Sequence, residues 1–524
     1  MIGARLDASR TGGVWFVDGP DTPFVPWSTL GARAERIAGA LARDGLAAGD
    51  PVGLAIPHGR PFLEAFLGVT LAGGIPAPMY PPTGLEALDG WCELAGHAVR
   101  STRARFVLVD REVRRVAPAL HLESDALRAI LTVDDLDGPP LRAPPDPRRP
   151  ALLQLTSGST SRPKVVVVRP EHLEANVGAF TRGLGAGPAD VIASWLPLYH
   201  DMGLVGHTLG ALWIDARLAL QHPLAFLKRP ASWLGTIDRY RATISIAPNF
   251  AYDLVERRTS PEGRSRLDLS CWRVAGCGAE PIDGSTLRRF AAAFAGSGFR
   301  ESAFLPCYGL AEHTLAVTLP PPGRGLVVER GFVGCGGPLP DHTVRIEAPD
   351  GRTVDEGVVG EIVARGPSVT TDGALRTGDL GFVRDGELFV CGRLKDLIIV
   401  RGRNHHPHDL ERAACAVDGV RPGGAAAFAV PGDGGEVAVL IVEADAAEAR
   451  FYSAVSRAVQ DATGLQVRVE VVPPRTLPKT SSGKLRRSEA RDRYLAGTLR
   501  PRIGGARTLA QAELGRARAA GRRP

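Results

Sequence analysis

The stretch LLQLTSGSTSRPKVVVV, residues 152–168, decides which fold and chemistry this chain of 524 residues can carry. A β-type run is followed by six consecutive hydroxyl or glycine residues, 156–161, and then by Lys164. Glycine lets backbone N–H groups approach an anion, the hydroxyls add donors and the lysine adds charge, which suits a polyphosphate. The spacing of a Walker loop is absent. The pattern alone leaves two readings open, a phosphate-binding loop and a flexible polar loop.

Around this stretch, the first half of the chain alternates short β-type runs with helical patterns. Apolar runs such as 51–57, 191–198 and 271–278 read as buried strands, and segments such as 284–296 have helical periodicity. This alternation is typical of an α/β architecture in which helices cover parallel-rich sheets. The Pro-rich segment 138–150 reads as a linker or surface loop.

The predicted secondary structure changes after about residue 325. β-type runs separated by Asp-Gly and Glu-Gly turns predict an antiparallel, β-barrel-like subdomain. A second compact unit follows, with a helix opening at Pro407. We therefore expect a large N-terminal domain (1–392), a small α+β C-terminal domain (393–497) and a basic tail (498–524) that has few large apolar residues.

Charge is concentrated at one end of the chain. The formal net charge is +6, but residues 485–524 contain eleven arginines and three acidic residues, so residues 1–484 are close to neutral. This distribution does not indicate a nucleic-acid-binding protein. Two readings of the basic end stay open: steering of an acidic protein partner, and a solvated tail without a role.

Cysteine usage and hydropathy indicate the compartment. The seven cysteines form no C-x-x-C and are irregularly spaced, which argues against a disulfide framework and a zinc site. His405, His406 and His408 lack partners of a metal-ligand pattern. The N-terminus has no signal-peptide core, and charged residues interrupt the apolar stretch 203–220. We expect a cytoplasmic protein without a membrane span, with a monomer as the default state.

Six motifs occur in order between residues 152 and 487. After the first stretch come SWLPLYHDMGLVG (194–206), CYGLAEHTLAVT (307–318), TGDLGF (377–382), GRLKDLIIVRGRNHHPHDLE (392–411) and LPKTSSGKLRR (477–487). Together they resemble the adenylate-forming superfamily of acyl-CoA synthetases, nonribosomal peptide adenylation domains and luciferases. The forms LPLYHDMGL, YGLAEHTL and IVRGRNHHPHDLE look most like the fatty acyl-AMP ligase branch.

The resemblance implies an activity. Such an enzyme uses ATP and Mg²⁺ to convert a carboxylic acid, here a fatty acid, to an acyl-adenylate with release of pyrophosphate. It then passes the acyl group to the phosphopantetheine thiol of an acyl carrier protein, or of a carrier domain in a polyketide or peptide synthase. Because the carboxylate and ATP are both anions, orientation and cationic stabilisation must supply most of the catalysis. The large domain would be the AMP-binding domain and the small domain a mobile lid.

The resemblance also assigns residues to the substrates. Tyr308 would stack on adenine, Asp379 would bind the ribose hydroxyls and the 156–164 loop would hold the phosphates. The residues expected at the nucleotide are Thr156, Ser157, Gly158, Ser159, Thr160, Lys164, Gly278, Ala279, Tyr308, Gly309, Asp379 and Arg393. Those expected on the acyl side are His200, Gly276 and Cys277, with Gly276–Gly278 as a wall between the two pockets.

Catalytic roles would fall to Lys484, Glu312 and Thr156. Lys484 would bridge the carboxylate and the α-phosphate, and Glu312 would ligate Mg²⁺, which prefers oxygen ligands. Lys395 lies where the superfamily places the hinge of its small domain, and rotation there would separate the two half-reactions.

Each of these residues also has an ordinary structural reading. Tyr308 could be a core residue, Glu312 could cap a helix and Asp379 could hold a turn. Lys395 and Lys484 could be solvated surface residues.

Three other functions remain open. An acyl-CoA ligase would share every adenylation residue and differ only in the acceptor. Two S-x-x-K matches admit a serine acyltransferase, although its companion motifs are missing. A non-catalytic nucleotide-binding module is the third. The short GPSVTTDGALRTGDL segment (366–380) departs in length from the usual pattern of the acyl-AMP ligases.

Overall fold

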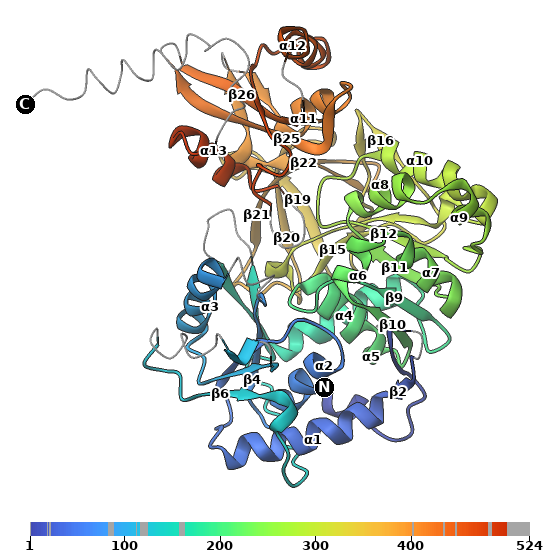
Figure 1. Ribbon diagram of the computed structural model, residues 1–524, viewed down its shortest axis with the longest axis vertical. Helices are drawn as coiled ribbons and strands as arrows, with labels where there is room; N and C mark the ends of the chain where they lie inside the picture. Colours follow the sequence, from blue (N-terminus) through green and yellow to red (C-terminus); the bar gives the residue numbers. More distant parts are fainter. Residues whose placement is uncertain are drawn as a thin grey trace, which may run out of the picture. The chain divides into compact units, whose positions relative to one another are not determined.

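The computed structural model divides the chain into two compact units (Figure 1). The units are Met1–Cys391 and Gly392–Pro524, and the sequence placed the boundary between them one residue further on. The described residues are 2–17, 19, 22–81, 88–111, 113–115, 124–156, 163–400, 403–432, 435–445, 448–479 and 485–499.

A seven-stranded sheet in the order β13-β12-β11-β9-β10-β1-β2 dominates the first unit. All its neighbouring strands pair in parallel except β1 and β2. Its strands are β1 (Gly13–Val17), β2 (Phe24–Pro26), β9 (Val191–Ser194), β10 (Arg217–Gln221), β11 (Ile244–Ala247), β12 (Val274–Cys277) and β13 (Phe304–Pro306). Strands β9 and β12 were expected from their apolar runs, which suit a sheet covered on both faces.

The helices around this sheet bury large aromatic side chains. Trp233, Tyr252 and Phe290 come from α7, α8 and α10 and belong to one core cluster with Phe304 of β13. The helices are α4 (Pro170–Gly183), α5 (Gly210–Trp213), α6 (Pro223–Lys228), α7 (Ala231–Tyr240), α8 (Asn249–Arg258), α9 (Pro261–Ser265) and α10 (Gly284–Phe294). Shorter 3₁₀ turns are η1 (Ile2–Arg5), η3 (Val113–Arg115), η5 (Val133–Asp135), η7 (Ala295–Ser297), η8 (Glu301–Ala303) and η9 (Ala311–His313).

A second, four-stranded parallel sheet has the order β4-β3-β5-β6. It comprises β3 (Pro51–Ala55), β4 (Ile75–Pro78), β5 (Phe106–Val109) and β6 (Ala129–Thr132), with helices α1 (Trp27–Arg43), α2 (Arg60–Leu71) and α3 (Leu88–Thr102). The stretch 152–168 forms an antiparallel hairpin of β7 (Leu152–Thr156) and β8 (Lys164–Val168). Thr156 and Lys164, which flank the polar loop in the sequence, are therefore partners in this hairpin.

Antiparallel strands make up the rest of the first unit, as the turn-rich sequence indicated. The main sheet runs β19 (Thr343–Glu347), β20 (Gly360–Arg365), β21 (Leu375–Arg384) and β22 (Glu387–Arg393). The last two residues of β22 already belong to the second unit. Smaller pairings involve β14 (Tyr308–Gly309), β15 (Ala316–Leu319), β16 (Val328–Glu329), β17 (Phe332–Val333) and β18 (Gly337–Pro338).

The second unit is a small α+β domain built on the sheet β25-β26-β27. Its elements are η10 (Leu394–Asp396), β23 (Ile398–Val400), β24 (Arg403–His405), α11 (Pro407–Cys415), β25 (Val420–Gly432), β26 (Gly435–Ala444), α12 (Ala449–Thr463), β27 (Arg468–Val472) and α13 (Arg487–Leu495). Leu499 is buried in the core of this domain, so ordered packing extends into the expected tail. Residues 500–524 lie outside the described residues.

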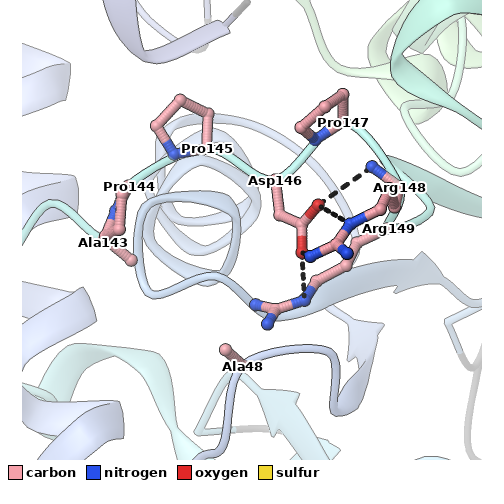
Figure 2. A pocket seen from close by; sticks show the side chains of 8 residues that line it. All are labelled: Ala48, Ala143, Pro144, Pro145, Asp146, Pro147, Arg148 and Arg149. Carbon is pink, nitrogen blue, oxygen red and sulfur yellow. Dashed lines mark hydrogen bonds and ion pairs between the residues drawn. The ribbon is translucent and has the colours of Figure 1, made fainter.

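The Pro-rich segment 138–150 runs without helix or strand, as expected of a surface loop. It borders a hollow in which Asp146 accepts hydrogen bonds from Arg148 and pairs with Arg149 (Figure 2). The hollow is lined by Ala48, Ala143, Pro144, Pro145, Asp146, Pro147, Arg148 and Arg149. The one acid of this lining is already neutralised and none of the six motifs reaches it, so the hollow is not a candidate for the nucleotide site.

These elements confirm the expected α/β fold class, with parallel-rich sheets and covering helices. Within the described part of the chain, no helix has both the length and the apolarity needed to cross a membrane.

Candidate active site

The site forms where parallel strands of the large sheet end. Strands β9, β12 and β13 all belong to this sheet, and the chain leaves their carboxyl ends toward His200, Gly278 and Tyr308 respectively. Ligands of open α/β sheets bind at this edge. The sheet therefore brings together three segments that lie far apart in the sequence.

Tyr308 and Asp379 are joined directly. The Tyr308 hydroxyl donates a hydrogen bond of 2.7 Å to Oδ2 of Asp379, and both side chains are almost fully buried. Asp379 lies within β21, whose preceding Gly378 has a φ of +70°. The residues expected at adenine and ribose thus share one corner, although sequence placed them 71 positions apart.

Glu312 lies on a tight turn, residues 311–316, which we call the Glu312 turn. The turn begins with η9 and passes through Thr314, whose φ of +68° and ψ of −51° are strained for a β-branched residue. Such a conformation costs about 1–3 kcal/mol and persists only where surrounding contacts impose it. Gly309 allows the turn to close, because a Cβ there would overlap the Leu315 carbonyl oxygen.

The end of β12 and the residue that follows it, Gly276–Gly278, pack closely against neighbouring segments. A Cβ on Gly276 would lie 2.5 Å from Ile246 Cγ1, and one on Gly278 would lie 2.8 Å from the Cys307 carbonyl oxygen. Tyr252 donates a hydrogen bond of 2.8 Å to the Gly276 carbonyl. Only glycine at these two positions lets the chain pack this closely. The expected wall between two pockets stays a prediction.

Backbone strain also marks this wall. Ala279 has a φ of +69°, an unusual value for a residue with a side chain. The next residue, Glu280, accepts a hydrogen bond of 2.6 Å from the Phe250 backbone N–H at the start of α8. This contact fixes the path of the chain at the expected nucleotide position.

The thiols of Cys277 and Cys307, near the expected wall, are unreactive. Burial raises the pKa of the Cys277 thiol well above its ordinary value and raises the pKa of Cys307 to about 12. Both thiols are therefore protonated at neutral pH and are poor nucleophiles. Their role is packing, which fits Cys277 as a wall residue and not as an acyl acceptor.

His200 lies between β9 and η6 (Met202–Leu209), which is a π-helix. Its Nδ1 lies 2.6 Å from Asp201 Oδ1, and this contact orients the ring. The preceding Tyr199 carbonyl accepts a hydrogen bond of 2.9 Å from Gln154 of β7. The residue next to the expected acyl entrance is thereby hydrogen-bonded to the hairpin whose strands flank the expected phosphate loop. π-Helical turns of this kind are frequent at functional sites.

A second histidine, His207, belongs to this π-helix, and its side chain is buried. The Ile246 backbone N–H donates to its Nε2, and its Nδ1 lies 2.7 Å from Ser194 Oγ. Because Nε2 accepts, Nδ1 must carry the proton of the neutral ring. Burial lowers the pKa of His207 to about 3. It is a structural histidine that joins β9, η6 and β11.

The ends of the polar loop face each other across the hairpin. Thr156 pairs with Lys164 in the β7–β8 ladder, and Lys164 is exposed. Next to the loop, Nε2 of His97 on α3 donates a hydrogen bond of 2.9 Å to the Pro163 carbonyl. Ser157, Gly158, Ser159 and Thr160 lie outside the described residues.

The remaining expected residues belong to the second unit. Arg393 ends β22 and Lys395 lies in η10, both exposed. Lys484 lies outside the described residues, but both flanks of its loop are described. Lys479 pairs with Leu485, and the Lys479 ammonium donates a hydrogen bond of 2.9 Å to the Gly423 carbonyl.

Three residues after Lys484 in the sequence, Arg487 is the centre of a largely buried ion cluster. It binds Glu411 through two hydrogen bonds of 2.6 and 2.7 Å and lies 3.6 Å from Asp396. These two carboxylates outweigh the effect of burial and raise the pKa of Arg487. Asp396 follows the expected hinge residue directly, so the cluster connects the hinge segment to the helix that follows the Lys484 loop.

The residues present fit a magnesium ion at Glu312. Its carboxylate is half-buried and makes no hydrogen bond or ion pair with any described residue. A carboxylate with free oxygens suits Mg²⁺, which takes one or two protein carboxylates together with substrate phosphates. No group of three or more metal-ligating side chains occurs in the described ranges.

Comparison with known proteins defines the family. The sequence profile of AMP-binding enzymes matches residues 10–372. A putative acyl-CoA synthetase of Caulobacter vibrioides is 36% identical over 545 residues, covering 94% of this chain and 95% of its own. JamA of Moorena producens, a medium-chain-fatty-acid–[acyl-carrier-protein] ligase, is 33% identical over 512 residues, with coverages of 85% and 86%. A solved structure from a study of fatty acyl-adenylate ligases from E. coli and L. pneumophila is 34% identical, with coverages of 94% and 97% and a TM-score of 0.87.

The chain therefore belongs to the AMP-binding enzyme family. Within this family, the resemblance to fatty acyl-AMP ligases that the six motifs indicated is confirmed by these relatives.

Sequence reasoning missed the residues that support the site from behind. Asn176 of α4 and Thr370 before β21 bind the backbone of the Glu312 turn, and Gln154 and Tyr252 hold neighbouring segments. None of them lies in a motif position to which chemistry was assigned. Their contacts are side chain to backbone and long-range, which a single sequence does not reveal.

Proposed function

We propose that this protein is a fatty acyl-AMP ligase. It activates a fatty acid with ATP, releases pyrophosphate, and transfers the acyl group from the adenylate to the phosphopantetheine thiol of an acyl carrier protein. The proposal is supported by the family membership and by relatives named for fatty acyl adenylation and for ligation to a carrier protein. Polyketide, nonribosomal peptide or lipid biosynthesis is the setting in which such a product is consumed.

The observation that carries the proposal is the convergence of Tyr308, Asp379 and Glu312 at one edge of the large sheet, where the Glu312 carboxylate has no partner among the described residues. In this arrangement Asp379 accepts the ribose hydroxyls and the ring of Tyr308 lies against adenine. The loop between Thr156 and Lys164 holds the β- and γ-phosphates through backbone N–H groups and hydroxyls. These contacts fix the α-phosphorus in front of the acyl pocket.

The acyl carboxylate enters from the other side of the Gly276–Gly278 wall, past His200. Its oxygen attacks the α-phosphorus, and the bond to the β-phosphate oxygen breaks as pyrophosphate leaves. Lys484 stabilises the charge shared by the carboxylate and the α-phosphate. Mg²⁺ at Glu312, when bound, neutralises charge on the phosphate oxygens. Orientation of two anions is the main contribution of the protein.

Transfer of the acyl group needs access for a second substrate. Rotation of the C-terminal domain about Lys395 removes Lys484 from the site and admits the carrier thiol. The thiol sulfur attacks the acyl carbon, and AMP leaves as the acyl–phosphate bond breaks. The exposed position of Lys395 and Arg393 at the start of the second unit supports such a hinge.

The test is a two-stage assay on the purified full-length protein. Pyrophosphate release is measured with ATP, Mg²⁺ and a series of carboxylic acids of increasing chain length. We expect release that depends on a medium or long fatty acid, followed by acylation of a holo-carrier protein seen by mass spectrometry. Absence of acid-dependent pyrophosphate release with every acid of the series would refute the proposal.

A second candidate is an acyl-CoA ligase, because the Caulobacter relative carries that name. It uses the same first half-reaction and differs in the thiol acceptor. Incubation with equal concentrations of CoA and holo-carrier protein separates the two. We expect carrier loading to dominate; robust acyl-CoA formation without carrier loading would select the second candidate.

A further inference from the structure

The Glu312 turn is strained, and strain of this kind needs an external cause. Thr314 has a positive φ, and the Leu315 N–H donates a hydrogen bond of 2.8 Å to the His313 carbonyl two residues earlier, which closes a γ-turn. A β-branched residue rarely takes this conformation. Contacts from outside the turn must therefore impose it.

Asn176 of α4 holds the C-terminal side of the turn. Its amide nitrogen donates to the carbonyls of His313 (3.1 Å) and Ala316 (2.8 Å), and its amide oxygen accepts the Ala316 N–H (3.1 Å). The side chain is fully buried. One asparagine thus pairs with the backbone in the way a neighbouring strand would, from 137 to 140 residues away in sequence.

The N-terminal side is held by the short GPSVTT segment before β21. The Glu312 carbonyl accepts two hydrogen bonds from Thr370, one from its N–H (3.0 Å) and one from its hydroxyl (2.9 Å). In the same segment, the Ser368 carbonyl accepts the Thr314 hydroxyl at 2.8 Å. The 366–371 segment belongs to the stretch that is shorter than the usual family pattern. It therefore holds the backbone of Glu312, the residue expected to bind the metal.

These contacts bind only the backbone of Glu312 and leave its carboxylate without a partner among the described residues. We propose that Asn176 and Thr370 are positioning residues, which fix the Glu312 turn so that the carboxylate is already placed for the Mg²⁺ of bound Mg·ATP. The inference rests on the proposed function and names the residues that prepare its metal site. A preset ligand binds more tightly because no ordering cost remains to be met on binding.

Asn176 also links the expected metal site to the expected phosphate loop, because its helix follows that loop closely in the sequence. Helix α4 begins at Pro170, two residues after the end of β8, and β8 starts at Lys164 of the polar loop. The same short run of chain that carries the phosphate loop thus carries the side chain that holds the Glu312 turn.

The test measures metal binding without turnover. Free Mn²⁺ is titrated by electron paramagnetic resonance against the full-length protein with a non-hydrolysable ATP analogue. Thr370→Val keeps the shape and the N–H bond of Thr370 but loses its hydroxyl bond, and we expect about fivefold weaker Mn²⁺ binding. Asn176→Ala loses every hydrogen bond between this side chain and the turn and should weaken Mn²⁺ binding more than Thr370→Val does.

Thr181→Val is the matched control, because Thr181 is a buried threonine of the same helix whose hydroxyl bonds only within α4. It should bind Mn²⁺ as the wild type does. If Thr370→Val shows wild-type Mn²⁺ affinity, or only a lower melting temperature, the positioning role is wrong. Glu312→Gln distinguishes failure of the positioning role from failure of the metal site: wild-type Mn²⁺ affinity in that variant would overturn the proposed metal site itself.

Discussion

The hydroxyl of Tyr308 donates a 2.7 Å hydrogen bond to Oδ2 of Asp379. This bond connects the end of the large parallel sheet to the antiparallel sheet of β19–β22, since Tyr308 follows β13 and Asp379 belongs to β21. It fixes the orientation of the Asp379 carboxylate relative to the ring of Tyr308. A change in the position of Tyr308, the proposed adenine contact, should therefore also change the position of Asp379, the proposed ribose contact.

Tyr308→Phe tests this dependence. The ring that lies against adenine is retained, but the charge-assisted hydrogen bond, worth about 1.5–3 kcal/mol, is lost and Asp379 is no longer oriented by it. We expect the KM for ATP in ATP–pyrophosphate exchange to rise roughly tenfold, with a smaller change in kcat. A variant with an unchanged KM and only a reduced melting temperature would show that the bond is purely structural.

The strands of the parallel sheet could be predicted from the sequence for a local reason. Strands such as 191–194 and 274–277 are short, wholly buried apolar runs. In a parallel sheet, the loops that follow such strands all begin at the same edge, the one formed by the carboxyl ends of the strands. The strand order of the structure places His200, Gly278 and Tyr308 after strands that end at the same edge of the sheet. From the sequence, these residues were assigned to the site by the family resemblance.

The supports of the site were not accessible, because their signal is three-dimensional. Thr314 has no local feature that predicts a positive φ, and its conformation is imposed by Asn176 and by the 366–370 segment. The apolar stretch 203–220 had no clear assignment either. It divides into a π-helix, a short α-helix and β10, and Gly203 lets the π-helix begin against the Pro197 carbonyl, where a Cβ would overlap that oxygen.

The C-terminal domain gives a stability prediction at Arg487. Replacing it with methionine leaves the buried Glu411 with only its 3.0 Å bond from the Ala427 N–H. Breaking a buried ion pair on one side costs about 3–5 kcal/mol. All seven tryptophans lie in the first unit, so the loss should be seen by hydrogen exchange in α11 and α13 and not by tryptophan fluorescence.

Arg450→Met is the control for this prediction, because the Arg450–Glu448 pair is largely exposed. Exposed pairs contribute about 0–1 kcal/mol. Similar protection of α11 in both variants would mean that the buried cluster contributes no more than a surface pair.

His207 predicts how the first unit responds to acid. Burial lowers its pKa to about 3, whereas the unfolded chain titrates near pH 6.5. Between those values the unfolded state binds a proton that the folded state excludes, so acidification costs up to about 1.4 kcal/mol per pH unit at this residue. We expect His207→Gln to melt at a lower temperature at pH 7 but to lose less stability between pH 7 and pH 5. If the melting temperatures of the two proteins fall by the same amount between pH 7 and pH 5, His207 is not a neutral histidine that folding keeps from being protonated.

Lys484 gives the most direct test of the chemistry. Its side chain would stabilise charge only while the carboxylate attacks the α-phosphate, so Lys484→Ala should reduce acid-dependent pyrophosphate release by roughly 10²–10³-fold. Transfer from a synthetic acyl-adenylate to the holo-carrier protein should proceed at close to the wild-type rate, because that step does not use this lysine. Lys479→Ala is the matched control in the same motif, since its ammonium is occupied by the Gly423 carbonyl, and it should keep most of the pyrophosphate release. Intact release in Lys484→Ala would remove the lysine from the mechanism, and equal loss of both half-reactions would point to a folding defect of the C-terminal domain instead.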